Sequence, residues 1–292
     1  MALPLVVGVD GSEASLRAVN WAVEEAALRA CELRIVYASL WEPYEGADPA
    51  VAPGRSDRSG TEERILRSAV VRAAAHGLEV KTSTHAAAEE PEDLLLREAR
   101  NATALITGRR GRGPVRELLL GSVSLAVAAR APCPVIVVRG SAAGRDGTHE
   151  RILLGVGDAA SSGAAARFAF AEASARRCVL DAVRSWRVPA HAGADHPLLT
   201  RESASAHEQR ARALLTEALR APAKLHPEVR VRPVAVEGLA RRILIDRSAA
   251  ADLLIVGARR RHGHLGLQVG RVGHAVLHHA DCPVAVVPQH GT

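Results

Sequence analysis

The chain carries the same sequence pattern twice, and this duplication restricts its fold more than any other feature. The segment A-P-C-P-V-I-V-V that begins at Ala131 returns as A-D-C-P-V-A-V-V from Ala280, a shift of 149 residues. Nearer the start of each copy, L-V-V-G-V from Leu5 matches I-L-L-G-V from Ile152 at a shift of 147 residues. Solenoid repeats are about 20 to 50 residues long. A period this long therefore indicates two duplicated domains.

The length of the chain agrees with this division, because 292 residues suit two domains of roughly 100 to 200 residues each. We expect one domain over residues 1–140 and a second over 150–292. A Gly-, Ser- and Ala-rich stretch at 140–148 is typical of a short flexible linker. No signal-peptide pattern and no run of 18 apolar residues is present, so we expect a soluble cytoplasmic protein without a membrane partner.

Within the first copy, short apolar runs alternate with segments of helix-forming composition. Such alternation predicts an α/β fold with a parallel sheet. We expect two tandem doubly wound domains, each with a five-stranded parallel sheet in the order 3-2-1-4-5, flanked by helices. Expected loops lie at 41–60 and 188–205. The expected strands are 3–9, 32–40, 78–84, 104–107 and 134–139, and the expected helices are 14–30, 64–75, 91–100 and 122–130.

A glycine segment after the fourth expected strand has the composition of a phosphate-binding loop. Gly108 ends the strand, Gly111 follows three residues later, and Gly121-Ser122 opens the next helix. Glycines allow close backbone approach, and the free N–H groups at a helix start favour an anion. The segment is neither a Walker A loop nor a dinucleotide-binding G-x-G-x-x-G loop. The alternative is a set of ordinary turn glycines.

Asp10 ends the first expected strand and would lie across a crevice from Gly108. In an open doubly wound sheet, ligands bind beyond the carboxyl ends of the strands where the strand order reverses. In the order 3-2-1-4-5, that point lies between strands one and four. Asp10 would then suit a sugar hydroxyl or a base edge. The alternative is that Asp10 caps the first helix, although Ser12 could do so instead.

These segments together resemble the universal stress protein family, and the two copies resemble its tandem members. The resemblance rests on V-V-G-V-D-G-S from Val6, the G-x2-G-x9-G-S segment from Gly108 and A-P-C-P-V-I-V-V from Ala131. It implies ATP binding, with or without Mg²⁺, and stacking of the two domains as a pseudo-dimer; a homodimer stays open. It places Asp10 and Ala38 near the adenosine, Thr107 and Gly108 beside the ribose and phosphates, and Gly111, Gly121, Ser122 and Val123 around the triphosphate.

The second copy departs from this pattern at three places. Arg260 stands where the first copy has Gly111, Arg271 stands where it has Ser122, and Gly157 stands opposite Asp10. An arginine at a close-approach glycine occupies space meant for phosphate. We therefore expect one ATP per chain and a degenerate second site; the alternative is that Arg260 and Arg271 bind a different anion.

Charge divides unevenly between the copies. Residues 1–149 hold 18 Lys/Arg against 19 Asp/Glu, whereas residues 150–292 hold 20 against 13. The basic half could contact a polyanion or an acidic partner, or it could be a solvated surface. No nucleic-acid motif accompanies the charge and aromatic residues are scarce, so nucleic acid is not expected as a partner.

The cysteines and histidines do not form a recognisable site. The four cysteines form two repeat-related pairs without C-x-x-C spacing, which favours packing positions over a disulfide framework or zinc. His274 and His278 are four residues apart on an expected helix, but no Asp, Glu or Cys is placed to complete a metal site. We expect no metal there.

Three functions fit the sequence. The favoured one is a regulatory stress-response protein whose association changes with ATP occupancy. A slow ATP hydrolase or phosphoryl donor is the first alternative, although no carboxylate cluster or water-positioning residue accompanies the glycine segment. A nucleotide-independent structural partner protein is the second.

Overall fold

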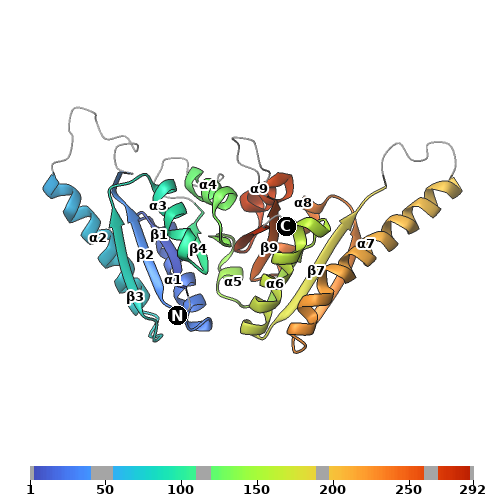
Figure 1. Ribbon diagram of the computed structural model, residues 1–292, viewed down its shortest axis with the longest axis horizontal. Helices are drawn as coiled ribbons and strands as arrows, with labels where there is room; N and C mark the ends of the chain where they lie inside the picture. Colours follow the sequence, from blue (N-terminus) through green and yellow to red (C-terminus); the bar gives the residue numbers. More distant parts are fainter. Residues whose placement is uncertain (1–2, 41–54, 110–119, 189–196, 260–268, 290–292) are drawn as a thin grey trace. The chain divides into compact units, whose positions relative to one another are not determined.

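The computed structural model describes residues 3–40, 55–109, 120–188, 197–259 and 269–289 (Figure 1). The chain divides into two compact units, Met1–Arg139 and Gly140–Thr292. Within each unit, five parallel strands form a sheet with helices on both faces. The predicted tandem α/β architecture is therefore confirmed.

In the first unit the strands lie in the order β3-β2-β1-β4-β5, which is the predicted order. The central strand β1 pairs in parallel with both β2 and β4, and the side chains of Leu5, Val6 and Val7 are fully buried. Apolar runs that are buried on both faces are typical of parallel sheets covered by helices. The strands are β1 (Leu5–Val9), β2 (Leu33–Ala38), β3 (Thr82–Ala87), β4 (Ala104–Gly108) and β5 (Val135–Val138).

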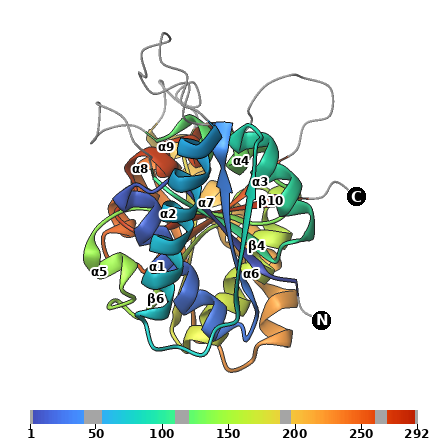
Figure 2. The ribbon, with the colours of Figure 1, turned by 90° about the vertical axis from the view of Figure 1, so that its left-hand side faces the viewer.

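The helices of this unit cover both faces of its sheet. A Cβ atom at Gly8 would contact Leu95 of α3, whereas one at Gly108 would contact Ala14 of α1, so α1 and α3 lie on opposite faces. Figure 2 shows α1 and α2 on one side of the strands and α3 and α4 on the other. The helices are α1 (Glu13–Leu28), α2 (Arg55–Ala74), α3 (Pro91–Glu98), the 3₁₀ turn η2 (Ala99–Asn101) and α4 (Ser122–Arg130).

The second unit repeats this topology with its strands in the order β10-β9-β6-β7-β8. Its helices pack in the same pairs, α6 with α7 and α8 with α9. Its elements are α5 (Ala142–Arg145), β6 (Arg151–Gly155), α6 (Ala159–Arg176), β7 (Val179–Trp186), α7 (Pro197–Leu225), β8 (Val231–Glu237), α8 (Ala240–Ser248), β9 (Leu253–Arg259), α9 (Gly270–His279) and β10 (Val284–Gln289).

The third strand lies later than the expected 78–84. The strand pairs with β2 from Leu33 opposite Thr82 to Ala38 opposite Ala87. Leu78, which made the earlier segment look like a buried strand, is 43% exposed. Because β3 is an edge strand, its half-exposed polar residues do not give the apolar run that marks a central strand.

Two helices begin earlier than expected and shorten both predicted loops. α2 begins at Arg55 and α7 at Pro197. Polar side chains cover much of α2, including an ion pair between Glu63 and Arg67, and such a helix lacks a strong apolar stripe in the sequence. Although α7 has 29 residues, neither it nor another helix of the described ranges is apolar enough to cross a membrane.

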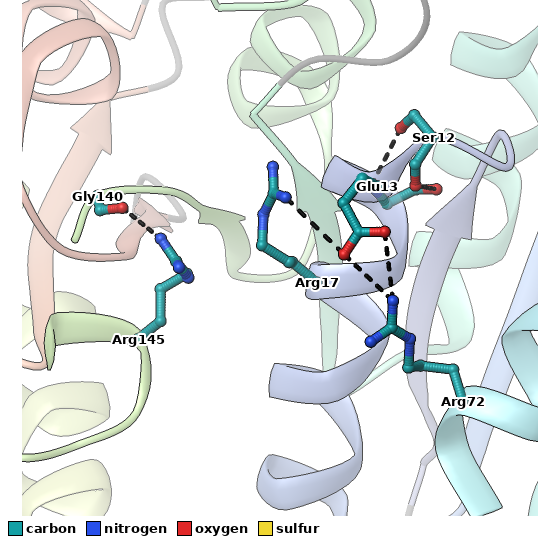
Figure 3. Close-up of polar contacts among 7 residues, drawn as sticks. Ser12, Glu13, Arg17, Arg72, Gly140 and Arg145 are labelled. Atoms are coloured by element: carbon teal, nitrogen blue, oxygen red, sulfur yellow. Dashed lines mark hydrogen bonds and ion pairs between the residues drawn. The ribbon is translucent and has the colours of Figure 1, made fainter. Parts of the chain in front are cut away.

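The expected flexible linker at 140–148 is wrong, because these residues form an ordered part of the second unit. Gly140 has a φ of 84°, and a Cβ atom there would lie 2.1 Å from the carbonyl oxygen of Asp281. The Ser141 N–H donates to that carbonyl at 2.8 Å, and the Ser141 hydroxyl caps α5 by accepting from the Gly144 N–H at 3.2 Å. The Arg145 guanidinium donates to the Gly140 carbonyl (Figure 3).

Candidate functional site

The predicted site residues of the first unit lie at one edge of its sheet. β1 is flanked by β2 and β4, so the direction of strand succession reverses between β1 and β4. Asp10 directly follows β1, Ala38 ends β2, and Gly108 ends β4. Because parallel strands end at the same edge, these three residues meet at the switch point where ligands bind in folds of this kind.

The register of the strands places three of the predicted residues on one face. Val7 lies opposite Ile106 and Gly8 lies opposite Val36, so Gly8 is level with Thr107. Side chains two residues apart in a strand share a face, which assigns Asp10, Ala38 and Thr107 to the face of Gly8. The Cβ position of Gly8 is 3.0 Å from the side chain of Leu95. The candidate site therefore lies on the face that α3 and α4 cover.

Asp10 shapes the turn after β1 and does not cap α1. Its Oδ1 accepts a hydrogen bond from the Ser12 N–H at 2.9 Å. Ser12 is the N-cap of α1, and its hydroxyl accepts from the Ser15 N–H at 3.2 Å. The alternative of Asp10 as the helix cap is therefore wrong. No group among the described residues is bonded to Oδ2 of Asp10.

The exposed start of α1 is held by charged side chains on the other face of the sheet. Glu13 lies 3.1 Å from the Arg72 guanidinium of α2 and 3.9 Å from that of Arg17 (Figure 3). All three side chains are at least a third exposed, and exposed pairs contribute little to stability. They link the start of α1 to α2 without contributing much to the stability of the packing.

Gly108 is glycine for a structural reason that the sequence did not indicate. A Cβ atom at this position would lie 2.6 Å from the Ala14 carbonyl oxygen, so β4 and the first turn of α1 can approach only without a side chain. The Gly108 carbonyl accepts a hydrogen bond from the Ser124 hydroxyl at 2.9 Å. Gly108 therefore lies where the end of β4 meets the first turns of α1 and α4, beside the candidate site.

The loop between β4 and α4 is closed at its base by a backbone hydrogen bond from Gly121 to the Arg109 carbonyl at 2.8 Å. Together with the Ser124 contact, this bond fixes the start of α4 beside β4. Ser124 was missed by the sequence analysis, although it lies two residues after the Gly121-Ser122 motif. The predicted residue Gly111 lies outside the described residues, as do Arg110, Arg112 and Gly113.

The start of α4 has the features of an anion-binding helix terminus. Gly121 is its N-cap with φ of −65° and ψ of 144°, and no side chain of the described residues caps the helix. Ser122 is exposed and Val123 is half-buried. Uncapped N–H groups and the helix dipole favour negative charge at this position.

Thr107 carries a buried hydroxyl group without a partner. The residue is 5% exposed, and its Oγ1 has no hydrogen-bond partner among the described residues. Leaving such a group unsatisfied costs roughly 1 to 3 kcal/mol. A buried donor at the carboxyl end of a strand, on the face of the candidate site, is therefore suited to bind a ligand atom.

The second unit contains a cavity of about 730 Å³ at the corresponding place. This volume lies within the range of roughly 300 to 1,000 Å³ that is usual for ligand pockets. The repeat therefore forms a ligand-sized space at its switch point. Gly157, Ser185, Val256, Gly257, Gly270, Arg271 and Val272 line the cavity, and these residues are the repeat counterparts of Asp10, Ala38, Thr107, Gly108, Gly121, Ser122 and Val123.

The turn after β6 is built differently from its counterpart in the first unit. Arg184 of β7 donates to the Val156 carbonyl at 3.4 Å and to the Gly157 carbonyl, and it lies 3.9 Å from the Asp158 carboxylate. Arginine therefore holds this turn where Asp10 and Ser12 hold the first. Arg260, the expected block to phosphate, lies outside the described residues.

No disulfide links the four cysteines, all of which lie in the part of the chain that the structure describes. Burial raises the pKa of Cys133 to about 12 and that of Cys178 to about 11, so both stay protonated at neutral pH. Cys31 and Cys178 are only partly buried. On α9, the rings of His274 and His278 stack with their centroids 4.4 Å apart.

The chain therefore consists of duplicated, doubly wound α/β domains, and the second of them has a ligand-sized space at its switch point. The family model described as "Universal stress protein family" matches residues 1–139 and again residues 148–288. The chain therefore belongs to the universal stress protein family, as a member with two tandem domains.

A relative of known family agrees with this assignment, and a solved structure of similar length shares the fold. The universal stress protein Rv2005c of Mycobacterium tuberculosis is 33% identical, and the match covers 98% of this chain and 97% of the relative. The crystal structure of a universal stress protein from Archaeoglobus fulgidus covers 98% of each chain with a TM-score of 0.69 at 16% identity, which shows the shared fold. A universal stress protein solved in complex with cAMP is 31% identical over 47% of this chain, with a TM-score of 0.36.

Proposed function

We propose that this chain is an ATP-binding universal stress protein with a regulatory role in the stress response, and that it binds one ATP in its first domain. The observation that carries the proposal is the hydroxyl of Thr107, on the same sheet face as Asp10 and at the edge where α4 begins. Among the described residues, this hydroxyl has no hydrogen-bond partner and α4 has no side-chain cap. A nucleotide offers a hydroxyl-bearing ribose and an anionic tail, and these groups match a buried polar side chain beside a helix N-terminus.

Each predicted residue has a role that its position supports. The Oδ2 of Asp10, which no described group engages, is suited to the base edge or a ribose hydroxyl, and Ala38 leaves room for the adenosine beside it. Thr107 and Gly108 would lie beside the ribose and phosphates. Gly121, Ser122 and Val123 at the start of α4 would hold the triphosphate, together with Gly111.

Magnesium would enter with ATP. The described residues contain no group of three or more His, Cys, Asp or Glu side chains that could hold a metal ion. Mg²⁺ is commonly bound through substrate phosphates and water, with few protein ligands, and Ser122 is exposed at the helix start where such a complex would lie.

We infer a regulatory role from the position of α4. ATP bound at its N-terminus would change the surface at the start of this helix, and such a change can alter how the domains or partner proteins associate. The two alternatives, slow hydrolysis or phosphoryl donation and nucleotide-independent binding, are separated by experiment: measured turnover would favour the first, and absence of nucleotide binding would favour the second.

Titration of the full chain with ATP tests the site. We expect one ATP per chain, and we expect Asp10→Asn and Gly121→Val each to weaken binding at least tenfold. Asn keeps an oxygen acceptor for the Ser12 N–H while removing the charge. Valine can adopt the backbone angles of Gly121, because its φ is negative, but its side chain would obstruct the approach of phosphate.

Thr103→Val is the matched control, because the Thr103 hydroxyl donates to the Leu3 carbonyl at the opposite edge of the sheet. This control should bind ATP as the wild type does. AMP and cAMP, titrated in parallel, identify the preferred nucleotide. Normal ATP binding by both Asp10→Asn and Gly121→Val would refute the site.

A further inference from the structure

Two helices that correspond in the repeat, α3 and α8, carry opposite charges at matching positions. At the shift of 149 residues, P-E-D-L-L-L-R-E of α3 aligns with A-R-R-I-L-I-D-R of α8. The three apolar residues in the middle stay apolar, whereas every charged position changes sign. The matching pairs are Glu92 with Arg241, Asp93 with Arg242, Arg97 with Asp246, and Glu98 with Arg247.

The change of sign at the last of these positions is matched within each unit. In the first unit, Glu98 of α3 lies 3.2 Å from the Arg34 guanidinium of β2. The repeat counterpart of Arg34 is Asp181 on β7, so the helix position and the strand position have changed sign together. The packing of the helix against the sheet therefore accounts for Arg247.

The other three changes of sign are not matched by a neighbour within the second unit. Within the described ranges of the chain, no side chain forms an ion pair with Arg241, Arg242 or Asp246. In the first unit, by contrast, two of the three counterparts are paired. Glu92 lies 3.5 Å from Arg130 and Arg97 lies 3.2 Å from Glu89, and these two partners correspond to His279 and Gly238.

The charges of α8 also oppose the dipole of their own helix. Acidic residues are favourable in the first turn of a helix and basic residues in the last turn, and α3 follows this rule. In α8, Arg241 and Arg242 lie in the first turn and Asp246 lies in the last. The arrangement in α8 is therefore unfavourable for the isolated helix, and acidic groups brought to its first turn from outside would stabilise it.

Two of the charged residues on each helix are exposed and share one face. Asp93 and Arg97 of α3 are exposed, as are Arg242 and Asp246 of α8, and residues four apart in a helix are neighbours on its surface. If the two helices lie parallel, each acidic residue faces a basic one. An antiparallel arrangement would instead place Asp93 opposite Asp246, so the order of the charges fixes the direction.

We propose that two copies of this chain associate through these helices, with α3 of one copy beside and parallel to α8 of the other. The occupant is a second copy because the chain itself supplies the complementary pattern, with the same spacing and the opposite signs. A two-fold pair would form the contact twice. The association should weaken with added salt, because its charges are exposed. The inference does not depend on ATP binding by the first unit.

Sedimentation velocity of the full chain without nucleotide tests the proposal, at ionic strengths of about 0.01 M and about 1 M. One variant reverses the order of charges on α3 (Asp93→Arg with Arg97→Asp), and a second reverses it on α8 (Arg242→Asp with Asp246→Arg). Both variants keep the net charge of the wild type. At the lower ionic strength we expect each to weaken self-association at least tenfold, because like charges then face each other. An equimolar mixture of the two variants should associate within about threefold of the wild type, because the opposite signs face each other again.

The matched control is Glu63→Arg with Arg67→Glu, which reverses an exposed pair four residues apart on α2 and also keeps the net charge. It should change self-association by less than about twofold. The proposal is overturned if the wild type stays monomeric at the lower ionic strength, as it would if α3 and α8 of one chain paired with each other. It also fails if either helix variant associates as tightly as the wild type, or if their mixture stays dissociated.

Discussion

At the residue scale, Thr107 and Val256 are repeat counterparts that differ by a hydroxyl group. Val256 is buried in an apolar setting that suits it, whereas the Thr107 hydroxyl is buried without a partner among the described residues. Keeping such a group costs stability unless something else binds it. The pair therefore allows a comparison between a position at which we propose a hydrogen bond to a ligand and its counterpart, which cannot donate one.

We expect Thr107→Val to weaken ATP binding by about three- to tenfold, the range expected for one hydrogen bond. The free energy of unfolding without ATP should stay the same or increase by about 1 kcal/mol, because the variant removes an unsatisfied polar group. Calorimetric titration and urea unfolding measure the two effects. A stabilised variant with unchanged ATP affinity would assign Thr107 a packing role only.

The candidate site could be predicted from the sequence only in part at this scale. Asp10 and the Gly121-Ser122 pair could be placed at one sheet edge because they follow strands whose order is predictable. Ser124 and Leu95 could not, because their roles depend on which helix face meets the sheet. The sequence also did not show why Gly108 must be glycine, because a Cβ atom there would clash with Ala14 only once β4 and α1 are packed together.

At the element scale, α1 and α6 begin differently, although each follows the first strand of its unit. Ser12 caps α1 through its hydroxyl, whereas Asp158 stands at the N-cap of α6 without a side-chain cap bond. An N-cap hydrogen bond contributes about 1 kcal/mol.

Ser12→Ala should therefore lower the free energy of unfolding by about 1 kcal/mol, and it should also loosen the turn that Asp10 holds. Asp158→Ala is the repeat-matched control and should cost less, because Asp158 makes no side-chain cap bond and its ion pair with Arg184 is long and exposed on the Asp158 side. Chemical denaturation with separate probes for the two units measures both. Equal costs would contradict the different capping of α1 and α6.

Strand order was predictable because alternating apolar runs and helices leave few topologies open. The exact place of β3 was not, because an edge strand has no buried run on both faces and its register depends on pairing with β2. The cavity of the second unit also could not be predicted from the sequence, because the size of a cavity depends on how neighbouring side chains pack. Only the change of residue types between the two copies could be seen in the sequence.

At the scale of the whole molecule, the duplication has kept one topology and changed the residues at the switch point of the sheet. The first unit holds Asp10 and Thr107 where the second holds Gly157 and Val256. If the proposed function holds, the two units of one chain differ in their ability to bind a nucleotide.

The junction between the copies supplies a further prediction, because residues 140–148 belong to the second unit. Gly140→Ala should disrupt the turn, since its φ is 84° and its Cβ position overlaps the Asp281 carbonyl. We expect native-state trypsin cleavage after Arg145 to increase at least fivefold in this variant, as followed by mass spectrometry. Gly147→Ala, which also has a positive φ but nothing near its Cβ position, is the control; equally rapid cleavage in wild type would contradict an ordered junction.

The bond between Ser141 and Asp281 also has a consequence for biosynthesis. The two residues are 140 positions apart, and domains generally fold as units from the N-terminus during translation. The first unit contains all five of its strands by Val138 and can fold while the rest of the chain is being made. The junction can form only after Asp281 has left the ribosome, so its docking follows the synthesis of the first unit and belongs to the folding of the second.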